Sequence, residues 1–209
     1  MSGYGDLDKR LAKGEVIILD GAVGTQLQKM GVPMSNTAWA ATALHTHPFT
    51  VRRMHEEYVK AGCDVITVNT YSAAPFNLIP LGLGDVVREL NLRAVMLAMD
   101  ARDRWAKDRP VYIAGSVSNY GLRMGIEKSP TGHGYYAERI ETSEDQAKAH
   151  LRQQADILAE AGVDLMLAES TGGTTHRRWV LEACLATGLP VWGGFKVHLD
   201  EGSTVPKVG

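Results

Sequence analysis

Five short apolar runs, most of them bounded by glycine, proline or aspartate, limit the fold of this chain more than any other feature. They cover residues 16–19, 64–68, 111–114, 164–168 and 191–195. Most are rich in valine, isoleucine or leucine, and they are nearly continuous, not alternating. This pattern is typical of strands that are buried on both faces of a parallel sheet. We therefore predict five parallel strands.

Stretches with helical periodicity separate these runs. Helices are predicted over residues 48–62, 86–101, 143–162 and 175–188. Pro48 stands where the first turn of a helix tolerates proline, and Ser143 with Gln146 has the pattern of a capping box. Two joints almost repeat, YVKAGCDVI at 58–66 and LAEAGVDLM at 158–166. A helix that ends at Ala-Gly and an aspartate that begins a strand indicate a repeated (βα) unit.

Strand–helix alternation allows either an open doubly wound sheet or a (β/α)8 barrel of the TIM type, which takes ~250 residues. The chain has 209 residues and ends just past the fifth predicted strand. It is therefore expected to be either a complete open sheet or a barrel truncated after strand five, in a single domain over residues 1–209. A truncated barrel exposes a sheet edge and apolar surface, so self-association or a completing segment is expected.

Charge and composition exclude several classes of partner. Lys and Arg number 22 against 24 for Asp and Glu, so the basic excess that binds nucleic acid is missing. No apolar run reaches the ~20 residues of a membrane span, and the N-terminus is too polar for a signal peptide. Cys63 and Cys184 are the two cysteines, which favours a reducing, cytoplasmic setting.

Polar residues follow the predicted strands where parallel α/β folds carry their sites. Asp20 and Glu169 would converge at that edge as a carboxylate pair, suited to an ammonium group or to acid–base chemistry. Nearby helix N-termini could bind a carboxylate, which together suggests an α-amino acid. Asp20 could instead belong to a simple Asp-Gly turn, and Trp39 and Tyr71 could line a pocket or belong to the core.

Other reactive side chains are weaker candidates. His45 and His47 precede a helix, away from any strand end, so a metal-binding role is not expected. His55 lies on the apolar stripe of its helix and is expected to be a hydrogen-bonded core histidine. Lys196, after the fifth strand, leaves open a Schiff-base role. Neither cysteine has the surroundings of a reactive thiol.

The segment 20–27, Asp-Gly-Ala-Val-Gly-Thr-Gln-Leu, resembles the opening signature of the homocysteine S-methyltransferases. Further matching segments follow in that family's order: Trp39, 55–58, 61–62, 69–71, 89–91 with Ala94, 114–117 and Glu169. The resemblance implies a (β/α)8 barrel with one Zn²⁺ at its mouth. It also implies methyl transfer from a sulfonium, ammonium or folate donor to homocysteine, giving methionine.

By this resemblance Asp20 and Glu169 would hold the substrate ammonium. Gly21, Thr70 and Ser116 would bind the substrate as well. Trp39, Asn69 and Tyr71 are possible pocket-lining residues.

The family's zinc ligands are three cysteines that end the sixth and seventh strands. The sequence stops before either strand, so no metal ligand is expected within it and its own activity is open. Two alternatives remain: a non-catalytic half-barrel that binds an amino acid or a partner chain, and a Schiff-base barrel lyase that uses Lys196.

Overall fold

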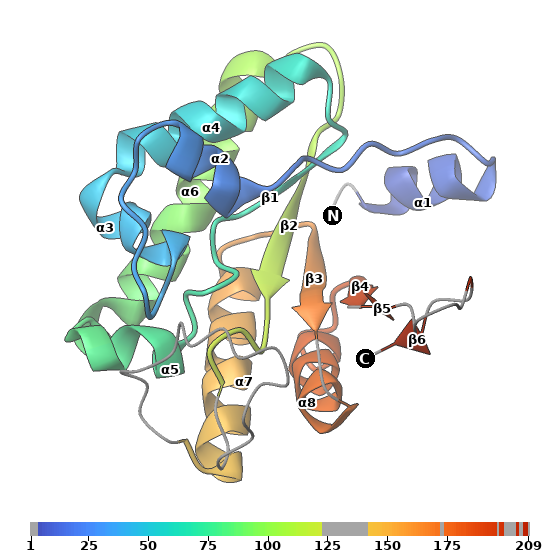
Figure 1. The fold of residues 1–209 in the computed structure, drawn as a ribbon. Coiled ribbons are helices and arrows are strands. Elements are labelled where there is room, and N and C mark those ends of the chain that lie inside the picture. The colour runs from blue at the N-terminus through green and yellow to red at the C-terminus, as the bar shows by residue number, and fades with distance from the viewer. Residues whose placement is uncertain are drawn as a thin grey trace.

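The computed structural model describes residues 4–122, 142–171, 174–195, 197–198, 204 and 207–208. Its main sheet has four parallel strands in the order β1-β2-β3-β4 (Figure 1). The strands are β1 (Val65–Thr67), β2 (Tyr112–Val117), β3 (Leu165–Thr171) and β4 (Val191–Phe195). A short antiparallel pair, β5 (Val197–His198) and β6 (Lys207–Val208), follows. Neighbours in sequence are thus neighbours in the sheet, which confirms the predicted parallel (βα) arrangement.

The run at residues 16–19 is not a regular strand, contrary to the prediction. It forms a single parallel bridge, Leu19 to Val65. The side chains of Val16 and Ile18 are 81% and 52% exposed. Its ladder with β1 ends after a few hydrogen bonds, because the next donor of β1, the Thr67 N–H, bonds to the side chain of Asp20 and not to a main-chain carbonyl.

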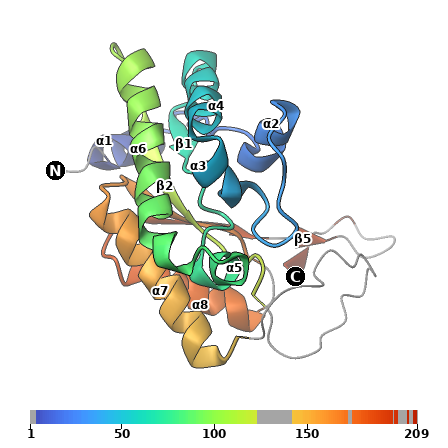
Figure 2. The same cartoon turned by 90° about the vertical axis from the view of Figure 1, so that its left-hand side faces the viewer.

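Four long helices lie side by side and cover one face of the sheet (Figures 1 and 2). They are α4 (Pro48–Ala61), α6 (Val87–Trp105), α7 (Glu144–Glu160) and α8 (Thr174–Leu185). All four correspond to predicted helices, although α6 continues past residue 101 to Trp105. The predicted capping box is present, because the Ser143 hydroxyl accepts from the Gln146 N–H and the Gln146 side-chain oxygen accepts from the Ser143 N–H.

Shorter helical segments connect these elements. They are α2 (Val23–Lys29), η1 (Ala40–Thr42), α3 (Ala43–Thr46), α5 (Pro75–Leu78), η2 (Ile79–Leu81) and η3 (Gly84–Val86). Helix α1 (Tyr4–Ala12) lies on the other face of the sheet, where Leu7 packs against Val65, Tyr112 and Leu165. Among the described residues, no helix is long and apolar enough to cross a membrane.

The two repeated joints have the same structure. Gly62 and Gly162 end their helices with φ of 101° and 89°, a left-handed conformation that suits glycine. The aspartate two residues later then accepts a hydrogen bond from a main-chain N–H of the apolar segment that precedes it in the order of the sheet. Asp64 Oδ2 accepts from the Ile18 N–H at 2.9 Å, and Asp164 Oδ2 accepts from the Ile113 N–H at 2.8 Å. The repeat thus sets the register of successive strands.

Candidate functional site

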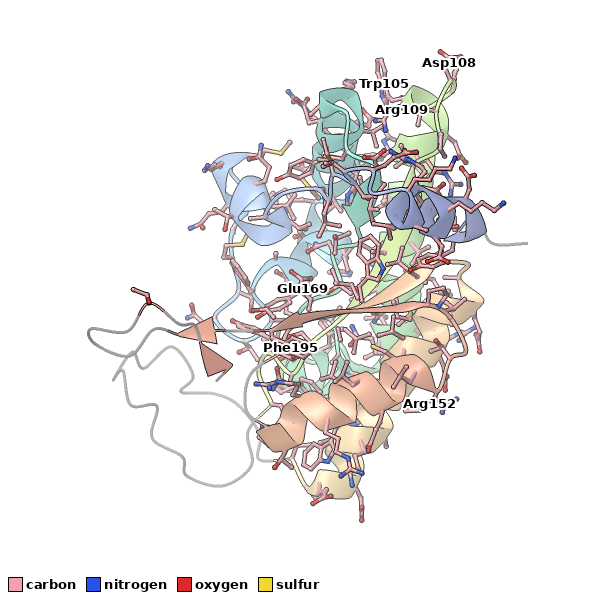
Figure 3. All side chains as sticks on the ribbon, turned by 90° about the vertical axis from the view of Figure 1, so that its right-hand side faces the viewer. Trp105, Asp108, Arg109, Arg152, Glu169 and Phe195 are labelled. Atoms are coloured by element: carbon pink, nitrogen blue, oxygen red, sulfur yellow. The ribbon has the colours of Figure 1, made fainter. Side chains whose placement is uncertain are left out.

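Two partly buried carboxylates, Asp20 and Glu169, lie at the carboxyl edge of the sheet. Asp20 follows the 16–19 segment, and Glu169 stands near the end of β3. The negative charge of Glu169 contributes to the raised pKa of Asp20, so the two groups lie within electrostatic reach of each other. Figure 3 shows Glu169 near the middle of the view, apart from Trp105 and Arg109 at its top. The structure brings together the acid pair that the sequence predicts.

Each carboxylate accepts hydrogen bonds from the strand beside it. The Thr67 N–H donates to Asp20 Oδ2 and the Thr67 hydroxyl donates to Oδ1, both at 2.8 Å. The Ser116 hydroxyl donates to Glu169 Oε2 at 2.5 Å. These bonds fix the orientation of both acids before any ligand binds.

The surroundings of the acid pair favour a cationic ligand. Burial raises the pKa of Asp20 to about 7, against the lowering effect of the two bonds from Thr67. Burial also raises the pKa of Glu169, against the bond from Ser116. Among the described residues, no lysine or arginine acts to lower either pKa. A bound ammonium group would supply the missing positive charge.

A cavity of about 210 Å³ opens beside Glu169. Its lining includes Trp39, Asn69, Tyr71 and Ser170, so all three possible lining residues named from the sequence contribute to it. Drug-sized ligands occupy pockets of roughly 300 Å³ and more. The cavity is therefore suited to a small molecule or to part of a larger one.

Three aromatic rings cluster at this cavity. The ring centroids of Trp39 and Tyr71 are 6.0 Å apart, those of Trp39 and Tyr120 6.1 Å, and those of Tyr71 and Tyr120 5.1 Å. Burial raises the pKa of Tyr71, whose hydroxyl also bonds to Ser118 and Ser170. Aromatic faces next to a carboxylate attract cations.

The backbone is strained at two lining residues. Trp39 has a φ of 38° and Ser170 a φ of 50°, whereas residues with a side chain rarely adopt positive values. Such conformations cost ~1–3 kcal/mol each and gather at functional sites. The strain supports a role for this cavity in binding.

The loop after β1, residues 69–73, is held by bonds from all sides. Its Asn69, Thr70 and Ser72 side chains donate to main-chain carbonyls of Ala40, Ser116 and Ala38 respectively. In return, side chains of two helices donate to the loop: Asn91 of α6 to Ala73 O at 3.0 Å, and Gln154 of α7 to Thr70 O at 2.8 Å. This network fixes the backbone that carries Tyr71.

The remaining predicted substrate-binding residues, Gly21, Thr70 and Ser116, are not among the residues that line the cavity. Thr70 and Ser116 are fully buried, and their hydroxyls bond to a carbonyl and to Glu169. A Cβ added at Gly21 would lie 2.8 Å from the Tyr58 hydroxyl oxygen, so a larger residue here would displace the Tyr58 side chain. These three residues therefore support the site, and their contact with a substrate stays a prediction.

Sequence reasoning missed Thr67, Gln154 and Tyr120. Thr67 stands in the apolar run 64–68, where threonine is read as an ordinary strand former. Gln154 is a buried polar residue in a helix, and its contact with Thr70 spans 84 residues of sequence. The one available signal was the alternation of Val65, Thr67 and Asn69 on one face of the strand.

The described residues do not fit the zinc ion that the resemblance implies. Among them, no three His, Cys, Asp or Glu side chains are grouped to hold a metal. Cys63 and Cys184 are both buried and unpaired, and burial raises the pKa of Cys184 to about 12. Neither buried thiol therefore suits a thiolate ligand.

The histidines and the lysine considered from the sequence lie outside the acid pair or outside the described residues. His55 is fully buried, as predicted, and burial lowers its pKa to about 4. The hydrogen bond expected for His55 is not found, because neither ring nitrogen has a partner among the described residues. His47 precedes Pro48 at the start of α4. Lys196 lies outside the described residues.

Taken together, these features define a β/α-barrel type of protein with an acid pair and an aromatic cavity at the carboxyl edge of its sheet. A family model described as Homocysteine S-methyltransferase matches residues 17–208. The chain belongs to the homocysteine S-methyltransferase family.

Individual relatives agree with this assignment. Homocysteine S-methyltransferase 1 of Arabidopsis thaliana is 31% identical over 195 residues, 86% of this chain and 57% of the relative. Selenocysteine methyltransferase of Astragalus bisulcatus is 32% identical over 75% of this chain and 51% of its own length. The chain thus spans about half the length of these relatives.

A solved structure shares the fold. The metallated form of the homocysteine methyltransferase MmuM from Escherichia coli superposes with a TM-score of 0.72 at 25% identity, over 90% of this chain and 66% of that protein. The predicted fold class, a (β/α)8 barrel of which this chain is one part, is confirmed.

Proposed function

We propose that this chain forms the homocysteine-binding part of a homocysteine S-methyltransferase, in which Asp20 and Glu169 bind the ammonium group of the amino acid. The proposal rests on the pair of partly buried carboxylates, which Thr67 and Ser116 hold and whose pKa values no cation within the described part of the chain lowers. Family membership supports the identity of the amino acid.

In the proposed reaction a methyl group passes from a donor to the sulfur of homocysteine. A new S–CH₃ bond forms, the bond between the methyl group and the donor breaks, and the thiol proton leaves; the product is methionine. Asp20 and Glu169 bind and orient the amino acid at the edge of the cavity that Glu169 lines. No step is assigned to a metal.

The aromatic cluster favours one class of methyl donor. Trp39 and Tyr71 line the cavity that Glu169 also lines, and the ring of Tyr120 packs against both. Rings of this kind attract sulfonium and quaternary ammonium groups, which also leave as neutral molecules once the methyl group is lost. We therefore propose a methylsulfonium or methylammonium donor in preference to a folate.

Calorimetric titration of L-homocysteine tests the proposal. We expect Asp20→Asn and Glu169→Gln each to weaken binding ~10-fold or more, because a charge-assisted hydrogen bond contributes ~1.5–3 kcal/mol. Glu160→Gln is the matched control, because Glu160 is an exposed surface glutamate that pairs with Arg88. Wild-type affinity in both acid variants would refute the assignment.

A further inference from the structure

The Thr67 N–H extends the short hydrogen-bond ladder between the 16–19 segment and β1 by bonding to the Asp20 side chain. Along one edge of β1, the Val65 N–H donates to Ile18 O, and the Asp20 N–H donates to Val65 O. In a parallel ladder every second residue directs its N–H to the same neighbour, so the next donor on this edge is Thr67. That N–H bonds to the Asp20 side chain at 2.8 Å. The carboxylate thus takes the place of a main-chain acceptor.

The Thr67 hydroxyl completes a two-point contact. It donates to the second carboxylate oxygen, Oδ1, also at 2.8 Å, and Thr67 itself is buried. With both oxygens held, the plane of the Asp20 carboxylate is fixed relative to β1. We infer that Thr67 is a positioning residue of the site, which holds the Asp20 carboxylate ready for the ammonium group of the ligand.

Apart from Thr67, the described side chains around Asp20 do not stabilise its ionised carboxylate. Among the described residues, Glu169 of β3, Tyr58 of α4 and Cys63 before β1 are the titratable groups whose charges interact with Asp20. None of them carries a positive charge when Asp20 ionises at neutral pH. Besides the backbone N–H of Asp20 itself, the two donors of Thr67 are what favour the ionised carboxylate.

The inference rests on the proposed function for the identity of the ligand, but its test does not require a ligand. The carboxyl carbon of Asp20 is followed by NMR during a pH titration of the chain labelled with ¹³C-aspartate. We expect Thr67→Val, which keeps the shape and the N–H but removes the hydroxyl, to raise the midpoint of Asp20 by about one pH unit. Thr67→Ser should restore the wild-type midpoint.

Two further variants make the test decisive. Thr187→Val removes a distant threonine hydroxyl, which bonds to Cys184 O, and should leave the midpoint unchanged. If circular dichroism shows that Thr67→Val does not fold, Thr67→Ala, which removes the same hydroxyl, takes its place. An unchanged Asp20 midpoint in a folded variant without the hydroxyl would overturn the inference.

Titration of L-homocysteine into the same proteins separates this inference from the proposed function. We expect affinity to rise with pH through the Asp20 midpoint and to follow that midpoint upward in Thr67→Val. If the midpoint shifts but the wild type does not bind homocysteine, the positioning role stands and the proposed function fails. If the wild type binds and the midpoint does not shift, the positioning role fails alone.

Discussion

The Ser116 hydroxyl of β2 donates to Glu169 Oε2 of β3 at 2.5 Å, and Ser116 is fully buried. The bond joins two neighbouring strands through side chains, next to the cavity that Glu169 lines. A buried hydroxyl donates a hydrogen bond to the carboxylate without adding a positive charge, so the site keeps its preference for a cationic ligand.

Ser116→Ala should weaken the binding of L-homocysteine by ~3- to 30-fold while the fold persists. The change removes one hydrogen bond to a charged group, and the pKa of Glu169 rises because the bond from Ser116 lowers it. Calorimetry at pH 7.5 measures the affinity. Ser143→Ala, at the N-cap of α7, serves as a control that reduces stability but not affinity. Equal losses of affinity in the two variants would contradict the assigned role.

Asp20 should make the folded chain less stable as pH rises from about 4 to 7. Its folded pKa, about 7, lies above the ordinary value of 3.8, so within this window the folded state holds a proton that the unfolded state releases. At 1.36 kcal/mol per pKa unit the effect is at most ~4 kcal/mol. Asp20→Asn should flatten this slope in urea unfolding at pH 5 and pH 7.5. The same slope in both proteins would show that Asp20 ionises normally.

Gln154→Leu should lower the free energy of unfolding by ~1–3 kcal/mol. The Gln154 side chain is fully buried and donates to Thr70 O, so the substitution leaves a buried carbonyl without that donor. Gln153→Leu, at an exposed position of the same helix, is the matched control. Urea unfolding measures both variants, and equal midpoints would mean that the bond to the loop carries no net stability.

The 16–19 segment should mediate association. Val16 is 81% exposed next to Ile18 at 52%, on a segment with one strand neighbour among the described residues. We propose that a second copy or a completing segment covers this edge. In sedimentation velocity, Val16→Lys should reduce concentration-dependent association, whereas Met96→Lys, on the exposed side of α6, should not. A wild-type chain that stays monomeric at every concentration would exclude the second copy.

Much of the fold could be predicted from local patterns, because apolar runs and helical stripes report burial directly. The acid pair was also predictable, since parallel strands bring the residues after their carboxyl ends to one edge. Thr67 and Gln154 were not, because their roles depend on partners 47 and 84 residues away. The 16–19 run was overpredicted, because an apolar run indicates strand propensity but not the number of neighbours that the strand has.

Asp20 and Glu169 should recognise the ammonium group of the ligand. Calorimetric titration at pH 7.5 of L-homocysteine against 4-mercaptobutanoate, the same molecule without its amino group, tests it most directly. We expect removal of the amino group to weaken binding at least ~10-fold, through the loss of charge-assisted hydrogen bonds to Asp20 and Glu169. Equal affinity for the two compounds would contradict it.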